Sequence, residues 1–397
     1  GTVSAATGVA ITAGGTITGT SIATTGAAAP LSLTAPGGIA VTNILSTGTT
    51  NLAAVNGAIA SNNLQSTGLI SATARTIALR GSGPLAFSTL AATAGDATVV
   101  STSGALSVTN GSASGNIALT TQNGALDVTT LAAQAISLTS NSSIGITGPV
   151  TAAGALTIAS QRTTNVSGIA SGTTVAIASG DLAIAAAGRI GTAGTTTSLS
   201  LTNSDASSRT FIGGDPVANN YSISATEMAR LFGNLITITA PRATTQGGNS
   251  LGSTRPPDVI VGAFTLTGGV SAAGNIGPAG TFTITTPGSM RVVGAVQMTG
   301  MTAANTLSLF AREALEVISG QGSISLSGPT GLGGILTLES DDIAVATTAA
   351  INSLASATTT ATFTSRLGQN DGILSDIGAL SANAIRLNAV GGIYIQN

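Results

Sequence analysis

The sequence contains no cysteine, histidine, tryptophan or lysine, and these absences exclude much of enzyme chemistry. Without cysteine or histidine there is no thiolate nucleophile, no Ser-His-Asp relay and no zinc or iron site of the usual kind. We therefore expect that the protein is not an enzyme and has no small-molecule substrate. We also expect no catalytic residue, no metal-binding residue, no cofactor-binding residue and no cofactor.

Charged and aromatic residues are scarce. Charged residues make up 7% of the chain, against about 25% in an average protein. The 12 basic residues are all arginine, the 14 acidic residues bring the formal net charge to −2, and aromatic residues make up only 2%. Scattered arginines with so few rings offer neither the basic surface nor the stacking platform of a nucleic-acid-binding protein. We expect no nucleic-acid partner.

Long hydrophobic runs are also missing. Residues 182–187 form one of the longest apolar stretches, far short of the roughly 18 residues that a membrane-spanning helix needs. Residues 1–4 show neither the basic nor the apolar region of a signal peptide, and there is no initiator methionine. We interpret the chain as a processed product or an internal segment of a longer protein.

Short strand-like units fill the sequence instead. In each unit two large apolar residues flank one small or polar residue, and Gly, Asn, Ser or Thr separates one unit from the next. Alternation with period two predicts a strand with one buried face. Such units lie at residues 106–108, 117–119, 126–128, 136–138, 156–158, 175–177 and 199–201.

The units recur at regular intervals. One series has steps of 19, 20 and 19 residues, through Ile117, Ile136, Leu156 and Val175. A second series has steps of 20 and 18 residues, through Leu106, Leu126 and Ile144. The C-terminal part shows steps of 17 and 19 residues, through Leu307, Ile324 and Ile343. Short strands repeated at about 19 residues are typical of the rungs of a parallel β-solenoid.

We therefore predict an all-β fold, a parallel β-helix of roughly 19–20 residues per rung. Rungs stacked at about 4.8 Å would give roughly 20 rungs and a rod of about 95 Å. Each rung would pair its backbone with its neighbours, so that a narrow interior of Ile, Leu, Val and Ala suffices. Two alternatives are a disordered Ser/Gly/Thr linker and an array of β-sandwiches. The fixed period argues against the first, and the shortage of aromatic residues argues against the second.

The repeat is weakest between residues 203 and 258. We divide the chain into a β-solenoid shaft at 1–202, an irregular and more charged excursion at 203–258, and a continued shaft at 259–397. Residues 224–227, Ser-Ala-Thr-Glu, fit a helical capping box, so we predict a short helix over 228–232 that Gly233 closes. The excursion carries eight charged residues: Asp205, Arg209, Asp215, Glu227, Arg230, Arg242, Arg255 and Asp258.

Two interpretations of the excursion remain open. It is either a recognition element on the side of the solenoid, or a loop that caps an exposed strand edge or marks a boundary between two solenoid segments. Under the second interpretation, which we favour, its charges are solvated or paired at the surface.

A second group of acidic residues consists of Glu339, Asp341 and Asp342, with Glu313 and Glu316 about one rung earlier. Neighbouring carboxylates could serve glycoside hydrolysis or bind a calcium ion. No aromatic stack for a sugar ring accompanies them, and the Gly-rich calcium repeat of β-helices is absent. A solvated turn is the interpretation that we prefer.

Units at residues 104–110, 124–128, 154–158 and 384–393 resemble the repeats of filamentous-haemagglutinin-type exoproteins and of related autotransporter passengers. The resemblance covers nearly all of the chain and is compositional and periodic. It implies a right-handed parallel β-helix that is exported across the Gram-negative outer membrane by a transporter. The sequence shows neither the Asn-Pro-rich N-terminal domain nor the C-terminal barrel of such proteins, so the resemblance implies their shaft or passenger region.

From these observations we expect an extracellular, cell-surface protein that is structural and adhesive. Strand-like residues near both ends, at 8–11 and 393–395, lead us to expect that copies stack end to end into a fibre. Surface groups or glycans are the expected ligands. The alternatives are a polysaccharide-degrading β-helix enzyme and a purely architectural component of a surface layer or matrix.

Overall fold

Short strands with alternating side chains follow one another along the computed structural model. It describes residues 1–242, 257–268, 274–302, 304–318, 322–328, 334–345, 350–354, 360–365, 374–377, 379–381, 384–389 and 393–395. The chain divides into two units. Unit 1 comprises Gly1–Thr174 and Ala185–Gly188, and unit 2 comprises Val175–Ile184 and Arg189–Asn397.

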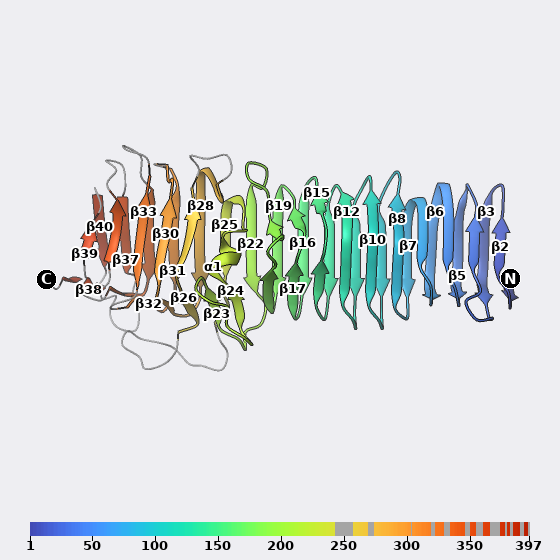
Figure 1. The fold of residues 1–397 in the computed structure, drawn as a ribbon, viewed down its shortest axis with the longest axis horizontal. Coiled ribbons are helices and arrows are strands. Elements are labelled where there is room, and N and C mark those ends of the chain that lie inside the picture. The colour runs from blue at the N-terminus through green and yellow to red at the C-terminus, as the bar shows by residue number, and fades with distance from the viewer. Residues whose placement is uncertain are drawn as a thin grey trace. The chain divides into compact units, whose positions relative to one another are not determined.

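Unit 1 is built from short β-strands that pair in parallel, as the blue-to-green part of Figure 1 shows. They are β1 (Thr2–Ala5), β2 (Val9–Thr12), β3 (Thr16–Thr24), β4 (Leu31–Thr34), β5 (Gly38–Ser46), β6 (Thr50–Ser66), β7 (Ile70–Gly81), β8 (Leu85–Ala92), β9 (Ala97–Ser101), β10 (Leu106–Ala113), β11 (Ile117–Thr121), β12 (Leu126–Ala133), β13 (Ile136–Ser140), β14 (Ile144–Ile146), β15 (Val150–Ala152), β16 (Ala155–Ser160), β17 (Thr163–Val166) and β18 (Ile169–Ser171).

The register of unit 1 confirms the predicted parallel β-helix and, in this unit, the predicted rung length. Ile117 pairs with Ile136, and Ile136 pairs with Leu156. On a second face Leu106 pairs with Leu126, which in turn pairs with Ile144. Residues about 20 positions apart therefore lie directly above one another, as a solenoid requires.

Alternation places the apolar residues of unit 1 inside. On β12, Leu126 and Val128 are buried, whereas Asp127 between them is exposed. A stacked coil satisfies the backbone through neighbouring rungs, so aliphatic side chains can fill most of the interior. Phe87 is the one aromatic ring of unit 1, and it is buried. This arrangement explains how a chain so poor in aromatic residues forms a continuous core.

A column of buried hydroxyl groups closes one corner of unit 1. Ser101, Thr121, Ser140 and Ser160 stack in register and end the strands β9, β11, β13 and β16. Their side chains donate to turn carbonyls, for example Thr121 Oγ1 to Gly124 O at 2.7 Å and Ser140 Oγ to Gly124 O at 2.8 Å. These bonds satisfy carbonyls that the turn would otherwise leave unpaired inside the protein.

Unit 2 contains one short helix, α1 (Ala225–Met228), within its described residues. Its strands are β19 (Thr174–Ser179, of which Thr174 belongs to unit 1), β20 (Asp181–Ile184), β21 (Arg189–Ile190), β22 (Ser198–Asn203), β23 (Thr210–Ile212), β24 (Tyr221–Ile223), β25 (Gly233–Thr239), β26 (Val259–Val261), β27 (Phe264–Thr267), β28 (Ile276–Thr286), β29 (Met290–Val292), β30 (Ala295–Thr299), β31 (Thr306–Ala311), β32 (Ala314–Val317), β33 (Ser323–Ser327), β34 (Ile335–Ser340), β35 (Asp342–Val345), β36 (Ala350–Leu354), β37 (Thr360–Ser365), β38 (Leu374–Ile377), β39 (Ala379–Ser381), β40 (Ala384–Ala389) and β41 (Ile393–Ile395).

From β25 to β39, each turn of unit 2 contributes one strand to each of three parallel sheets. The first sheet contains β22, β25, β28, β31, β34, β37 and β40 in this order. The second runs β24-β23-β26-β29-β32-β35-β38-β41, and the third runs β27-β30-β33-β36-β39. Unit 2 is therefore also a parallel β-helix.

The rung length predicted for the C-terminal part is wrong. Phe282 pairs with Leu307, and Leu307 pairs with Leu336, so these turns take 25 and 29 residues. The residues that appeared to repeat at 17 and 19 positions belong to three different sheets, since Leu307 is in β31, Ile324 in β33 and Ile343 in β35. The short intervals measure steps from face to face, whereas the rung is the whole turn.

The predicted capping box is confirmed, but the helix lies earlier than predicted. Ser224 is the N-cap of α1, and Glu227 completes the reciprocal pair of hydrogen bonds. The helix ends at Met228 with Ala229 as its C-cap, and Gly233 begins β25. Within the described residues no helix has the length and apolar character of a membrane span.

Candidate functional site

Asp181, the first residue of β20, binds the backbone of β24, which lies just before α1. Its Oδ1 accepts the backbone N–H of Leu182 at 2.9 Å and that of Ser222 at 3.0 Å. Burial raises the pKa of Asp181 above its usual value, and the negative charge of Glu227 adds to the rise. The carboxylate thus takes the place of a backbone acceptor between β20 and β24, at a cost in desolvation.

Glu227 and Arg230 hold the other end of β20. Glu227 Oε1 accepts the N–H of Ile184 at 2.8 Å, and Arg230 Nη1 donates to the carbonyl of Ile184 at 2.9 Å. Glu227 Oε2 accepts the N–H and the hydroxyl of Ser224, at 2.8 Å and 2.7 Å. One carboxylate therefore caps the helix and binds the strand at once. We call Asp181, Glu227 and Arg230 the β20 clamp.

Tyr221 lies in the core beside the β20 clamp. Its side chain is fully buried, and its hydroxyl has no hydrogen-bond partner within the described part of the chain. Burial raises the pKa of Tyr221 far above its usual range, and the negative charges of Asp181 and Glu227 raise it further. The phenol therefore stays protonated at neutral pH, and it contributes to the core through packing.

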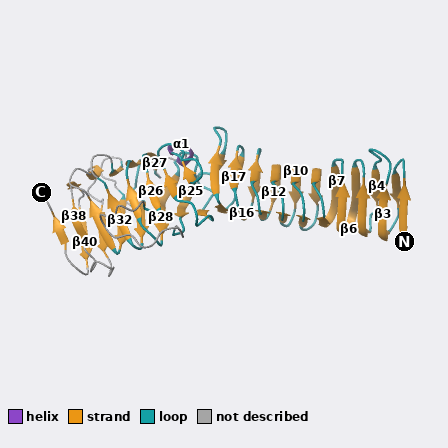
Figure 2. Cartoon of the chain, turned by 90° about the horizontal axis from the view of Figure 1, so that it is seen from below, coloured by secondary structure: helices purple, strands orange, loops and turns teal. Residues whose placement is uncertain are grey.

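The remainder of the segment around α1 joins the sheets of unit 2. β23 pairs with both β24 and β26 in the second sheet, and Ile190 of β21 bridges to Leu231. The helix α1 packs against β27, beside which Figure 2 shows it. Between β23 and β24, Asp215 and Asn219 are exposed, and Asn219 has a positive φ of 60°. This loop is the exposed part of an otherwise integrated segment.

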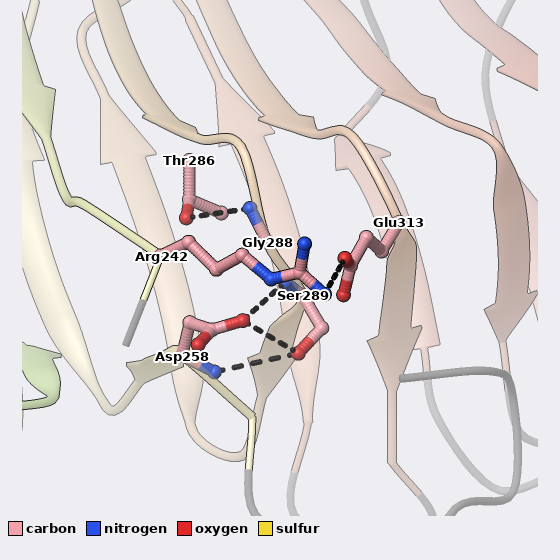
Figure 3. A network of polar contacts seen from close by, with 6 residues as sticks. All are labelled: Arg242, Asp258, Thr286, Gly288, Ser289 and Glu313. Atoms are coloured by element: carbon pink, nitrogen blue, oxygen red, sulfur yellow. Dashed lines mark hydrogen bonds and ion pairs between the residues drawn. The ribbon is translucent and has the colours of Figure 1, made fainter. Parts of the chain in front are cut away.

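A second polar network occupies the corner between the first and second sheets of unit 2 (Figure 3). Asp258 is 7% exposed, and its Oδ2 accepts the N–H of Ser289 at 2.8 Å and its hydroxyl at 3.3 Å. Gly288 fits closely beside this carboxylate, since a Cβ there would lie 2.0 Å from Oδ2. Arg242 Nη2 binds Glu313 Oε1 at 2.7 Å across the same corner. These contacts join three successive turns.

The acidic residues predicted as a group separate in the structure. Asp341 lies one turn beyond Glu313. Burial raises the pKa of Asp341, Arg312 opposes the rise, and the negative charge of Glu313 adds to it. Glu316 instead pairs with Arg291 at 2.6 Å on the second sheet. Glu339 belongs to β34 on the first sheet, and Asp342 opens β35 and is buried. Across the described residues, no three carboxylates gather closely enough to hold a metal ion.

Of the other predicted charges, Asp205 accepts the N–H of Ser207 at 2.8 Å within a turn, and the hydrogen bonds from Ser207 lower its pKa. Arg209 is half-buried at the end of the same turn. Arg255 lies outside the described residues. Asp181 was not predicted at all. Its sequence signal is one charge directly before the apolar run 182–187, in a region that otherwise lacks charge.

Comparison with known proteins adds no name to this fold. No protein-family model, curated protein or solved structure matches the chain. The carboxylates of Asp181, Glu227 and Asp258 all accept backbone N–H groups, so they act as substitutes for backbone acceptors. The two networks therefore stabilise turns and strand edges.

Proposed function

We propose that this chain is the structural and adhesive part of a secreted cell-surface protein. Its β-helical units present an extended surface, and ligands bind to that surface and to exposed loops. The proposed ligands are surface groups or glycans. Export through an outer-membrane transporter of a Gram-negative bacterium, followed by self-association of the exported protein into a fibre, belongs to the same proposal.

The observation that carries the proposal is the unbroken register from β9 to β16 in unit 1. From β9 through β11 and β13 to β16, each strand pairs in parallel with the next, and the inward residues are aliphatic except for the buried hydroxyl that ends each strand. Such a stack gains its stability rung by rung from backbone pairing and apolar burial. The fold therefore supports a long surface, and its outward residues are free to serve binding.

Among the described loops of unit 2, the one between β23 and β24 is the binding element that we propose. The β20 clamp fixes the residues that follow it, while Asp215 and Asn219 stay exposed. Binding residues are often found on loops that a rigid scaffold positions. A hollow of about 170 Å³ on unit 1, lined by residues 40–42 and 60–62, is too small for a sugar chain.

Surface labelling of intact cells tests the proposal. We would express the protein with its own export system in a Gram-negative host and add protease to intact and to permeabilised cells. The proposal predicts that antibody against unit 1 labels intact cells and that added protease removes this label. Protection of the protein until the outer membrane is permeabilised would overturn the proposed location.

A further inference from the structure

The loop between β23 and β24 contains the only Asp–Pro bond of the sequence, Asp215–Pro216. Both residues are exposed. A peptide bond to proline is a tertiary amide, and its nitrogen leaves as a secondary amine. The carboxyl group of an aspartate that precedes such a bond can reach its own main-chain carbonyl carbon, because the attack closes a five-membered ring. The loop therefore presents a nucleophile, a susceptible bond and solvent in one place.

Two glycines turn the chain away from β23 directly before this bond. Gly213 and Gly214 have φ angles of 79° and 68°, in the left-handed region that favours glycine. A Cβ on Gly213 would lie 2.7 Å from Cδ1 of Phe264, so a larger residue does not fit there. Within the described residues no backbone N–H donates to the carbonyl of Asp215. The amide between Asp215 and Pro216 thus lies outside the hydrogen-bonded ladder.

Hydrogen bonds fix the chain on both sides of the Asp215–Pro216 bond. Before it, the N–H of Gly214 donates to the carbonyl of Ala263 at 2.7 Å. After it, the N–H of Val217 donates to Oγ of Ser222 at 3.1 Å. The backbone around Asp215 therefore has few conformations, and rotation of the side chain is the main freedom that remains. Restricting the reacting groups in this way raises the rate of an intramolecular step.

The carboxyl group of Asp215 forms no ion pair within the part of the chain that the structure describes. The charged and titratable side chains at or within two residues of β20, β23, β24, α1 and β26 are Asp181, Arg209, Tyr221, Glu227, Arg230 and Asp258. Asp181, Glu227, Arg230 and Asp258 bind backbone groups of unit 2, and Tyr221 is fully buried. The side chain of Asp215 is therefore available for attack on its own carbonyl carbon.

We propose that the folded chain cleaves itself at Asp215–Pro216 in mild acid. A carboxyl oxygen of Asp215 attacks the main-chain carbonyl carbon of the same residue, the bond to the nitrogen of Pro216 breaks, and the carboxyl proton passes to that nitrogen. Water then opens the cyclic anhydride and leaves two carboxyl groups on Asp215. The reaction is a net hydrolysis of one peptide bond, with water as the only co-reactant. In acid the new amine takes up a further proton, which prevents its return.

The two fragments stay together after the cut. β23 before the bond pairs in register with β24 after it, through residues 210–212 and 221–223. Asp181 of the β20 clamp also holds β24 through the N–H of Ser222. The fragments, residues 1–215 and 216–397, therefore form one particle. The inference goes beyond the proposed surface role, because it gives the chain a chemical step of its own and a processed, two-chain state.

Denaturing electrophoresis of the full chain, incubated at a series of pH values from neutral to mildly acidic, tests this cleavage. The wild type is expected to yield fragments 1–215 and 216–397, identified by their intact masses, at a rate that rises as pH falls. The folded chain is expected to be cut at least about tenfold faster than the chain unfolded in urea at the same pH. Asp215→Ala and Pro216→Ala are expected to remain whole. Sedimentation in native buffer is expected to show the cut wild type as one particle.

Asp205→Ala is the matched control, because Asp205 is another turn aspartate of unit 2 but is followed by alanine. It is expected to leave the cleavage unchanged, and circular dichroism checks that every variant is folded at the pH used. A folded wild type that stays whole overturns the inference. So does a folded chain that is cut no faster than the unfolded chain, or cleavage that persists in Asp215→Ala. None of these results bears on surface labelling of cells, so the two proposals fail separately.

Discussion

The carboxylate of Asp181 accepts the backbone N–H of Ser222 at 3.0 Å, although 41 residues separate the two along the chain. Glu227 does the same for Ile184 across 43 residues. Side chains thus provide acceptors for strand N–H groups where the regular ladder is interrupted. Unpaired buried N–H groups are costly. The β20 clamp pairs such groups and therefore stabilises the packing of β24 and α1 against β20.

Replacing Asp181 separates its hydrogen bonding from its charge. Asp181→Ala removes the acceptor of two backbone N–H groups and is expected to lower the free energy of unfolding by about 1–3 kcal/mol. Asp181→Asn keeps an acceptor oxygen and removes the desolvated charge, so at pH 7 it is expected to be at least as stable as the wild type. Calorimetric melting temperatures, together with amide hydrogen exchange at Ser222, check both variants.

The pH dependence of this difference follows from the raised pKa of Asp181. The folded state binds the proton more tightly than the unfolded state, so the wild type gains stability relative to Asp181→Asn as pH falls from 7 through the raised pKa toward the ordinary value of 3.8. A gap between the two proteins that widens on acidification would contradict the assigned cause.

The column of buried hydroxyls in unit 1 predicts a contrast between two serines of one strand. Ser140 is 2% exposed, donates to Gly124 O at 2.8 Å and accepts the N–H of Ser142 at 2.9 Å. Ser140→Ala is expected to cost about 1–3 kcal/mol, because the N–H of Ser142 loses its acceptor, whereas Gly124 O keeps the hydrogen bond from Thr121. Ser137→Ala, at an exposed position of β13, is expected to change stability by less than about 0.5 kcal/mol. Chemical denaturation of the two variants measures the contrast.

Glycines that stack at the corners of unit 1 predict a second contrast. A Cβ on Gly124 would lie 2.5 Å from the backbone carbon of Gly104 on the rung below, whereas a Cβ on Gly83 would meet nothing within 4 Å. Gly124→Ala must push two rungs apart and is expected to cost about 1–3 kcal/mol. Gly83→Ala is expected to be neutral or slightly stabilising. Equal melting temperatures for the two variants would show that the rungs are not this closely stacked.

The sequence predicted the fold of unit 1 well, because one turn has a nearly constant length there. Ile117, Ile136 and Leu156 occupy one inward position of successive rungs, so the interval in the sequence equals the rung. In unit 2 the turns are longer and of unequal length. Intervals between neighbouring faces, such as Leu307 to Ile324, then resemble a repeat without being one.

The candidate site was predictable only where the signal is local. The capping box of Ser224 and Glu227 spans four residues and was found, because its geometry depends on neighbouring backbone alone. The bond from Glu227 to Ile184 and the corner pair Arg242–Glu313 depend on which turns lie together. Spacing in the sequence cannot predict which turns lie together when the rung length varies. For the same reason it could not predict that Glu316 and Asp341 lie apart.

Binding by the purified, folded protein tests the central claim most directly. Beads coated with the chain would be exposed to a panel of glycans and cell surfaces, with heat-unfolded chain and the variant Asp215→Ala/Asn219→Ala on matched beads. The account predicts saturable binding by the folded chain, weaker binding by the loop variant, and glycans that remain intact. Binding no greater than that of bare beads, or cleavage of a glycan, would contradict it.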